Sequence, residues 1–171
     1  MKDDKSLEVN EETIQIIGAQ GNATLRAING DVLPVLTSRQ LFTLPGVVLP
    51  FVIGRPKSMK LINDAVQNHQ EILVCPQMHA EIDDPYFDDI VQVGCIAEVI
   101  KIIKLNDNTM AAIIQGKCRA KIVEQACVLP YLKAKVELLD DEVVDKSSDS
   151  YNELSVLAWD AKKRFIDINR K

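Results

Sequence analysis

The sequence has few glycines, prolines and aromatic residues, and it contains no long apolar run. Its 7 glycines among 171 residues follow no repeat, which excludes a fibrous protein, and 47% hydrophobic residues exclude a disordered one. No apolar run approaches the roughly 18 to 20 residues that cross a bilayer. The N-terminal stretch MKDDKSLEVNEE is too acidic for a signal peptide, which needs a basic region followed by an apolar one. These absences predict a soluble, cytoplasmic, globular protein without membrane association.

Residues that carry chemistry are also scarce. The four cysteines stand singly in apolar stretches, without a CxxC pair or a neighbouring histidine, and therefore predict reduced, buried thiols and no zinc site. They are Cys75, Cys95, Cys118 and Cys127. The two histidines, His69 and His79, stand in no motif for metal binding or nucleophile activation. The sequence also lacks the glycine-rich loop followed by Lys and Ser or Thr that holds a phosphate. We therefore expect no catalytic residue, no metal site and no cofactor in this chain.

An acidic run, EIDDPYFDD, extends from Glu81 to Asp89. It lacks the oxygen spacing and the central glycine with which a calcium loop wraps its ion. The run predicts a solvated loop that Tyr86 and Phe87 anchor on the core.

The net charge of -5 and the pI of about 5.1 argue against binding to nucleic acid by charge alone. Basic residues alternate with apolar ones in two later segments, where they could form a basic strand face. They are Lys117, Arg119, Lys121, Lys133 and Lys135. No aromatic platform is interleaved among them, and we expect no nucleic-acid partner.

Apolar periodicity in the first half predicts strands and one short helix. A strand at a sheet edge, or one broken by a bulge, is expected over Leu44–Gly54, because Pro45 and Pro50 cannot donate to a central ladder. A helix is expected over 56–68 and a short strand over 71–77. The fold class is α+β, mainly β, with about six strands in a strongly bent sheet or open barrel.

The second half contains longer alternating segments. Alternation from Val91 to Leu105 slips after Val99, which predicts a bulge or sharp bend near Ile100. The run Asn106-Asp107-Asn108 predicts a hairpin into TMAAIIQG. Half-buried strands are then expected around residues 118–122 and 132–138.

The two ends of the chain differ from its middle. Residues 1–30 are polar and predict a flexible leader, whereas residues 143–171 predict a linker and a long helix. Ser150 and Glu153 form a capping box for that helix. Its apolar stripe consists of Leu154, Leu157, Ala161, Phe165 and Ile168. Because no glycine or proline stops the stripe before Lys171, we expect the helix to be cut short and more protein to follow.

The start of the first predicted helix is the best candidate binding site. Free backbone amides and the cations Arg55 and Lys57 meet there beside the apolar Phe51 and Met59. Such a surface could hold the main-chain oxygens of an extended peptide. Phe51, Arg55, Lys57 and Met59 are therefore the candidate contacts for a polypeptide, with a solvated helix terminus as the alternative.

Several dispersed motifs, in the right order, resemble the N-terminal domain of the bacterial Lon family of ATP-dependent proteases. The resemblance covers Val32 to about Glu142, and its clearest stretches are Leu33-Pro34-Val35-Leu36, Leu44-Pro45-Gly46-Val47-Val48-Leu49-Pro50, Gly54-Arg55, Gln115-Gly116 and Pro130-Tyr131-Leu132-Lys133-Ala134. The final helix is similar to the start of the helical region that follows in this family. The sequence departs at Thr37 and Ser38, where the family usually has Pro and Leu.

The resemblance implies a PUA-like domain over residues 31–142 that recognises unfolded or damaged polypeptides and supports assembly of a homo-hexamer for cytoplasmic protein quality control. It also implies that ATP, magnesium and the Ser-Lys protease site belong to modules beyond Lys171, so that this chain is not itself an enzyme. Two alternatives stay open. One is a stand-alone protein-binding adaptor, and the other is a PUA-like RNA-binding module that uses the basic strand face.

Overall fold

The computed structural model describes residues 26–27, 29–39, 41–106, 108–140 and 147–169, and it divides into two compact units. Unit 1 spans residues 1–139 and unit 2 spans residues 140–171. Most of the predicted leader lies outside the described residues. Arg26 and Ala27 are described, and Ala27 is buried against the first unit, so this part of the predicted leader is packed.

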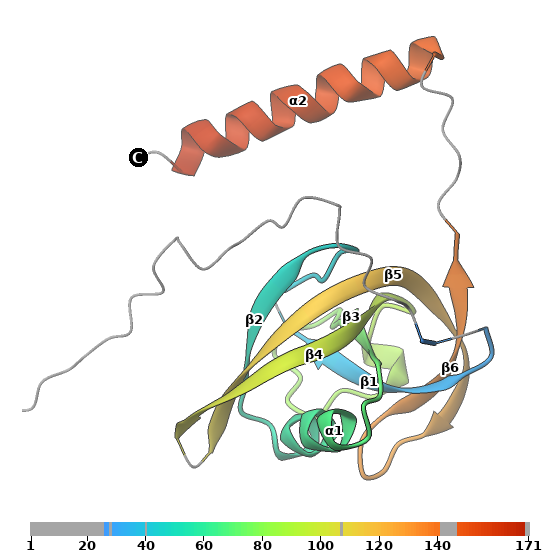
Figure 1. The fold of residues 1–171 in the computed structure, drawn as a ribbon, viewed down its shortest axis with the longest axis vertical. Coiled ribbons are helices and arrows are strands. Elements are labelled where there is room, and N and C mark those ends of the chain that lie inside the picture. The colour runs from blue at the N-terminus through green and yellow to red at the C-terminus, as the bar shows by residue number, and fades with distance from the viewer. Residues whose placement is uncertain (1–25, 28, 40, 107, 141–146, 170–171) are drawn as a thin grey trace, which may run out of the picture. The chain divides into compact units, whose positions relative to one another are not determined.

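A six-stranded sheet forms unit 1, which confirms the predicted mainly β class (Figure 1). Its strands are β1 (Val32–Ser38), β2 (Val48–Ile53), β3 (Ile72–Pro76), β4 (Val93–Asn106), β5 (Thr109–Cys127) and β6 (Lys133–Leu139). The strand order is β2-β5-β4-β3-β1-β6, and among these described strands β1 and β3 are the one parallel pair. As its prolines predict, β2 is an edge strand.

The long strand β5 bends this sheet. Its first half pairs with β2 and its second half with β6, while β4 pairs along both halves. Because β6 also pairs with β1, the sheet curls back toward itself. The sequence predicted two strands here, around TMAAIIQG and around residues 118–122, whereas the structure joins them into one strand of 19 residues.

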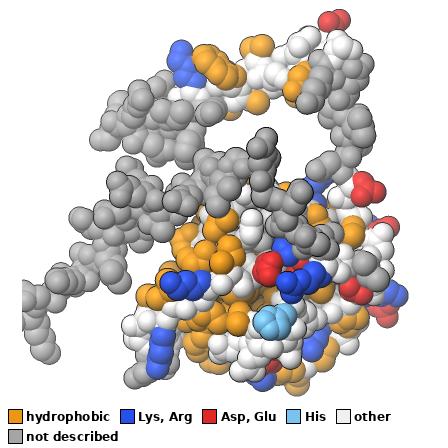
Figure 2. Space-filling model, viewed as in Figure 1, with side chains coloured by type: hydrophobic (Ala, Val, Ile, Leu, Met, Phe, Trp, Pro, Cys, Tyr) orange, Lys and Arg blue, Asp and Glu red, His pale blue; other side chains and the backbone are white. Residues whose placement is uncertain are grey.

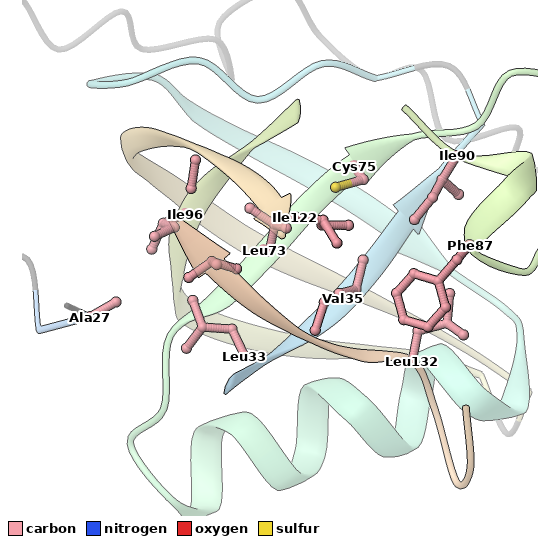
Figure 3. Packing of buried hydrophobic residues seen from close by; sticks show 13 residues of the cluster. Ala27, Leu33, Val35, Leu73, Cys75, Phe87, Ile90, Ile96, Ile122 and Leu132 are labelled. Atoms are coloured by element: carbon pink, nitrogen blue, oxygen red, sulfur yellow. The ribbon is translucent and has the colours of Figure 1, made fainter. Parts of the chain in front are cut away.

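Each face of the sheet carries a hydrophobic core. Alternate residues of a strand point to opposite faces, and β3 contributes Leu73 and Cys75 to one core and Ile72 and Val74 to the other. Figure 3 shows the first core, in which residues of β1, β3, β4 and β5 meet Phe87 and Leu132. The helix α1 (Pro56–Gln67) covers the second core.

Bulges fix which core each long strand faces: the bulge in β4 keeps Val99 and Ile102 on the second core, whereas the bulge in β5 moves the strand from the second core to the first. In β4, Val99 pairs with Ile114 and Lys101 pairs with Ile113, so Ile100 is the extra residue, which confirms the predicted bulge. In β5, Gly116 pairs with Ala97 and Cys118 pairs with Ile96, which leaves Lys117 as an extra residue that the sequence analysis missed. The predicted hairpin between β4 and β5 is confirmed by the pair Asn106 and Thr109.

The first helix, α1 (Pro56–Gln67), forms where it was predicted and ends one residue earlier. Pro56 occupies the first turn, where its missing amide costs no hydrogen bond, and Arg55 precedes it in an extended conformation. Leu61, Ile62 and Ala65 form its buried face. Asn68 caps the C-terminal end of the helix, and His69 follows with a φ of 50°.

Unit 2 contains the predicted long helix, α2 (Asp149–Asn169). Its cap is not the predicted Ser150, because the Ser148 hydroxyl accepts a hydrogen bond from the Tyr151 amide at 3.2 Å and the Ser148 carbonyl accepts one from Asn152. Ser148 and Ser150 are both residue types that cap helices, and the structure uses Ser148. Leu154 and Leu157 of the apolar stripe are exposed, as is Trp159 outside it, while the side chains of Phe165 and Ile168 lie outside the described ones.

The cysteines are free thiols, as predicted, but not all of them are buried. Cys75 and Cys95 lie in the core, and burial raises their pKa to about 12 and about 11 respectively. Cys118 is half-buried, and Cys127 is exposed at the end of β5. The prediction of a buried thiol was wrong for Cys127, because β5 extends past its core-facing residues before it ends.

The strand β5 and the turn before β2 approach each other closely at Gly116. The Gly116 amide donates to the Val47 carbonyl and the Gly116 carbonyl accepts from the Gly46 amide, each at 2.9 Å. A Cβ atom at Gly116 would lie 2.2 Å from the Leu44 carbonyl oxygen, which is backbone and cannot swing aside. Glycine is therefore required where this turn docks on the sheet.

We expect Gly116→Ala to lower the free energy of unfolding by about 1 to 3 kcal/mol, because the added methyl group must push the turn away from β5. Urea denaturation followed by circular dichroism measures this change. Gly54→Ala is the matched control, since a Cβ there would meet its nearest side chain at an ordinary 3.4 Å. Equal stability of Gly116→Ala and the unmodified chain would contradict the close approach.

Thiol labelling should separate the cysteines by burial. We expect a maleimide at pH 7 to modify Cys127 within minutes in the folded chain, whereas Cys75 and Cys95 react only after unfolding, since they are buried and hold raised pKa values. Mass spectrometry of peptides identifies the labelled residues, and Cys127→Ser is the control. Rapid labelling of Cys75 in the native chain would show that this core opens.

Candidate functional site

A cavity of about 470 Å³ opens at the start of α1, and we call it the α1 cleft. The first turn of α1 forms one wall, the segment 83–86 forms another, and Val128, Tyr131 and Leu132 contribute to a third. Its apolar lining residues are Val35, Pro56, Leu61, Pro85, Tyr86, Val128, Tyr131 and Leu132. Tyr86 and Val128 are exposed, at 56% and 42%, and form its apolar rim.

Arg55 joins three segments at this cleft. Its Nη1 donates to Thr37 Oγ1 at 3.1 Å, and its Nη2 donates to Gln77 Oε1 at 2.7 Å and to the Ile82 carbonyl at 3.1 Å. Gln77 in turn donates to the Ile82 carbonyl at 2.9 Å. The guanidinium therefore ties the ends of β1 and β3 to the segment that follows β3. Thr37, which stands at a departure from the family pattern, supplies one of the acceptors.

Burial lowers the pKa of Arg55, and the nearby cation Arg39 lowers it further, while Asp83 and Asp84 act in the opposite direction. Arg39 forms an ion pair with Asp83. Lys57 forms a second pair, with its Nζ 2.6 and 2.8 Å from the two carboxylate oxygens of Asp84. The cleft thus has a charged rim of both signs beside an apolar floor.

The structure brings the four predicted contact residues close to one helix start but does not expose them equally. Arg55 and Lys57 line the α1 cleft. Met59 is half-buried against the second core. Phe51 is only 5% exposed, because its side chain faces the second core, and so it offers almost no surface to a ligand. Tyr86 and Val128 provide the apolar surface that sequence reasoning assigned to Phe51.

The acidic run Glu81–Asp89 folds over the side of this cleft. Phe87 is buried at the start of a short 3₁₀ helix, Phe87–Asp89, as predicted. Tyr86 is exposed, so the prediction that it anchors the loop was wrong. Besides the buried Phe87, ion pairs from Arg39 and Lys57 and the Arg55 hydrogen bond to Ile82 hold the loop. These partners lie far away in the sequence, where local patterns carry no signal for them.

A second hollow, of about 640 Å³, adjoins the α1 cleft, and we call it the seam. It lies between the end of β1 with the residues that follow it and the edge strand β2. Four residues line both hollows: Thr37, Gly54, Arg55 and Ser58. Arg55 therefore stands where the cleft and the seam meet.

Among the described residues, no group of three or more His, Cys, Asp or Glu side chains is placed to hold a metal ion. Within the same residues, no helix combines the length and the hydrophobicity that crossing a bilayer requires.

Figure 2 shows hydrophobic side chains gathered over the region where β4 and β5 run in this view, beside a group of charged ones. The apolar and charged surfaces of this unit therefore lie next to each other.

Comparison with known proteins assigns the fold and the family. Residues 32–171 match the family model described as the ATP-dependent protease La (LON) substrate-binding domain. The chain belongs to the LON substrate-binding domain family. The resemblance found in the sequence is thereby confirmed, over nearly the whole of the described chain.

Relatives of this LON domain are full-length proteases. It is 37% identical over 125 residues to the Lon protease of Parabacteroides distasonis and 40% identical over 133 residues to that of Anaeromyxobacter dehalogenans. These matches cover 73% and 77% of this chain but only 15% of each relative. The chain thus spans about one seventh of the length of the Lon proteases it matches, and the family match places it at their substrate-binding part.

Solved structures show the same fold. The Lon N-terminal domain protein from Xanthomonas campestris matches with a TM-score of 0.56 at 14% identity, over 74% of this chain and 70% of that one. The N-terminal domain of the Mycobacterium avium complex Lon protease matches with a TM-score of 0.52 at 20% identity, over 81% and 73%. The strongly bent, mainly β sheet is therefore the architecture of Lon N-terminal domains.

Lys117, one of the five residues of the predicted basic strand face of the LON domain, is buried. Lys117 has a side chain only 2% exposed, and its Nζ lies 2.6 Å from Glu71 Oε1 and 2.7 Å from Glu98 Oε2. The bulge in β5 turns this side chain inward, whereas the alternation with Arg119 and Lys121 had placed it in solvent. Gly116 was the available signal, since a glycine inside a strand often marks a bulge.

This buried cluster also holds the N-terminal end of the domain. Glu71 accepts hydrogen bonds from the amides of Arg26 at 3.0 Å and Ala27 at 2.7 Å. Burial alone would lower the pKa of Lys117, but its hydrogen bonds to Glu71 and Glu98 outweigh that effect and raise it. The hydrogen bond from Lys117 also lowers the pKa of Glu98. Lys117 is therefore the cation that pairs with both carboxylates, while Arg26 adds a second cation 3.8 Å from Glu98 Oε1.

We expect Lys117→Met to lower the free energy of unfolding by roughly 3 to 5 kcal/mol, because it leaves the buried Glu71 carboxylate without its counterion. Lys121→Met, at an exposed position of the same strand, should change stability by less than about 0.5 kcal/mol. Thermal and urea denaturation at pH 7 measure both variants.

The pH dependence follows from the same cluster. A lowered folded-state pKa for Glu98 contributes stability above the ordinary glutamate pKa of about 4.3 and loses it as the pH falls through the folded value. Glu98→Gln should therefore flatten the acid limb of the stability profile below about pH 5. An unchanged acid limb in Glu98→Gln, or an unchanged stability in Lys117→Met, would contradict the ion cluster.

Proposed function

We propose that this LON domain recognises unfolded or damaged polypeptides for an ATP-dependent protease of cytoplasmic quality control. The observation that supports this most is the α1 cleft, in which an apolar floor and rim lie beside Arg55 and Lys57. Apolar side chains of an unfolded chain suit the floor, and its main-chain and carboxylate oxygens suit the cations. The family description adds support, since the matched model is a substrate-binding domain.

The proposal makes the chain a non-catalytic partner of the ATPase and protease activities. Its expected partners are polypeptide substrates and other Lon subunits, as a homo-hexamer, with no nucleic acid and no membrane. ATP and magnesium are expected to act outside this chain. The burial of Lys117 supports the exclusion of RNA, because it removes one cation from the proposed basic face.

Affinity for one copy should be low. A cleft that accepts many sequences makes few specific contacts, and an extended flexible ligand loses conformational entropy when it binds. We therefore expect a Kd of about 10 to 1,000 μM for a single domain. Several copies in one assembly would raise the avidity without any new contact.

Truncation of the two rim side chains, Tyr86 and Val128, tests whether the α1 cleft binds polypeptide. We expect the double variant Tyr86→Ala with Val128→Ser to weaken binding about fivefold, since truncation of anchoring side chains typically costs on the order of 1 kcal/mol. Fluorescence anisotropy with a labelled, reduced and carboxymethylated α-lactalbumin measures the affinity. Val123→Ser, which truncates an exposed valine outside the cleft lining, is the matched control.

Equal losses in the control and in the cleft variant would assign binding to general surface hydrophobicity. Unchanged affinity in the cleft variant would exclude the cleft as the contact. ATP hydrolysis or casein cleavage by the purified chain would overturn its non-catalytic role.

A further inference from the structure

Among the described strands, β2 pairs with β5 alone, and its other, free edge presents main-chain groups in a fixed pattern. The Val47 carbonyl accepts from Gly116 of β5, and successive residues of a strand direct their main-chain groups to opposite sides. Leu49, Phe51 and Ile53 therefore face β5, whereas Val48, Pro50 and Val52 face away from it. This assignment agrees with the position of Pro50, whose missing amide takes no bond from the β2–β5 ladder.

The end of β1 presents the same kind of edge from the opposite side of the seam. The Val35 amide donates to the Leu132 carbonyl at 2.8 Å, and the Ser38 carbonyl accepts from Gln77 beside β3 at 2.7 Å. By the same alternation, Thr37 directs its main-chain groups away from β3, toward the side of Val35. Strand β6 pairs with β1 only from Val32 to Pro34, so it does not extend along Thr37.

The seam lies between these two edges. Its lining includes Thr37 on one side and the consecutive residues Pro50–Gly54 on the other, within a volume of about 640 Å³. Val52 is 73% exposed and Leu41 is 41% exposed, so apolar side chains stand at its rim. A strand of the length of β2, six residues, extends about 20 Å.

We propose that the seam binds an extended polypeptide segment as an added β-strand paired with the free edge of β2. Outward donors and acceptors that recur at every second residue match the main chain of another strand. Main-chain pairing is independent of side-chain identity, which suits a domain that receives many unfolded sequences. This inference rests on the proposed function and defines its substrate as an apolar, strand-forming segment.

Pro50 limits how strongly such a strand pairs. It offers a carbonyl acceptor but no amide donor, so the full pair of bonds forms only at Val48 and Val52. An added strand therefore makes fewer bonds than a strand inside the sheet, which agrees with reversible capture.

The test uses the whole chain and an eight-residue peptide of alternating valine and threonine with a lysine at each end. Val52→Pro removes one outward donor while leaving the β2–β5 ladder intact, and Val52→Ala keeps the donor but truncates the side chain. We expect Val52→Pro to weaken peptide binding at least tenfold and Val52→Ala less than threefold. Protection of Cys75 from labelling verifies that each variant is folded.

A second measurement does not depend on any variant. Hydrogen exchange observed by NMR should show that the peptide slows exchange of the Val48 and Val52 amides at least fivefold, with no change at Leu49 and Phe51, which already face β5. Equal weakening by both variants, or protection that omits Val48 and Val52, would overturn the added strand. Capture of α-lactalbumin through the α1 cleft would then still stand, whereas failure of the unmodified chain to bind α-lactalbumin would overturn the proposed function itself.

Discussion

The pairing of one strand, β5, with three neighbours is the constraint on which the architecture depends. At any position a strand can pair with one neighbour on each of its two edges, so the three partners of this 19-residue strand must share two edges. Because β2 occupies one edge of β5 in its first half and β6 occupies that edge in its second half, the sheet must bend where the partner changes. The bulge at Lys117 lies at this change and shifts the buried residues of β5 from one core to the other.

The site follows from the same change of partner. Since β2 and β6 divide one edge of β5 between them, neither covers the end of β1, and a hollow forms beside it. Arg55 fills the junction of this hollow with the α1 cleft and ties together the segments around it. A single guanidinium with several donors suits this position, since it satisfies a hydroxyl, an amide oxygen and a main-chain carbonyl together.

Local patterns in the sequence were sufficient for most elements of the fold. The slip in alternation after Val99 located the bulge at Ile100, and Pro56 located the start of α1. The bulge at Lys117 could not be predicted from alternation, because every second residue is buried on both sides of it, from Ala112 to Ile122. The alternation in the sequence is therefore unbroken, although the strand changes from one core to the other. Similarly, alternation could not determine that Phe51 faces a core, and the partners of Arg55 lie 18 to 27 residues away. Contacts at such separations depend on the fold as a whole.

The proline in β2 has a consequence for the behaviour of the protein in concentrated solution. An exposed edge strand is a template on which a second copy of the same strand can stack, and repetition of that step builds fibrils. Pro50 sits in the middle of the edge, so two copies of β2 cannot form an uninterrupted ladder over all six residues. Pro50 therefore limits the stacking of this domain on a second copy of itself through β2.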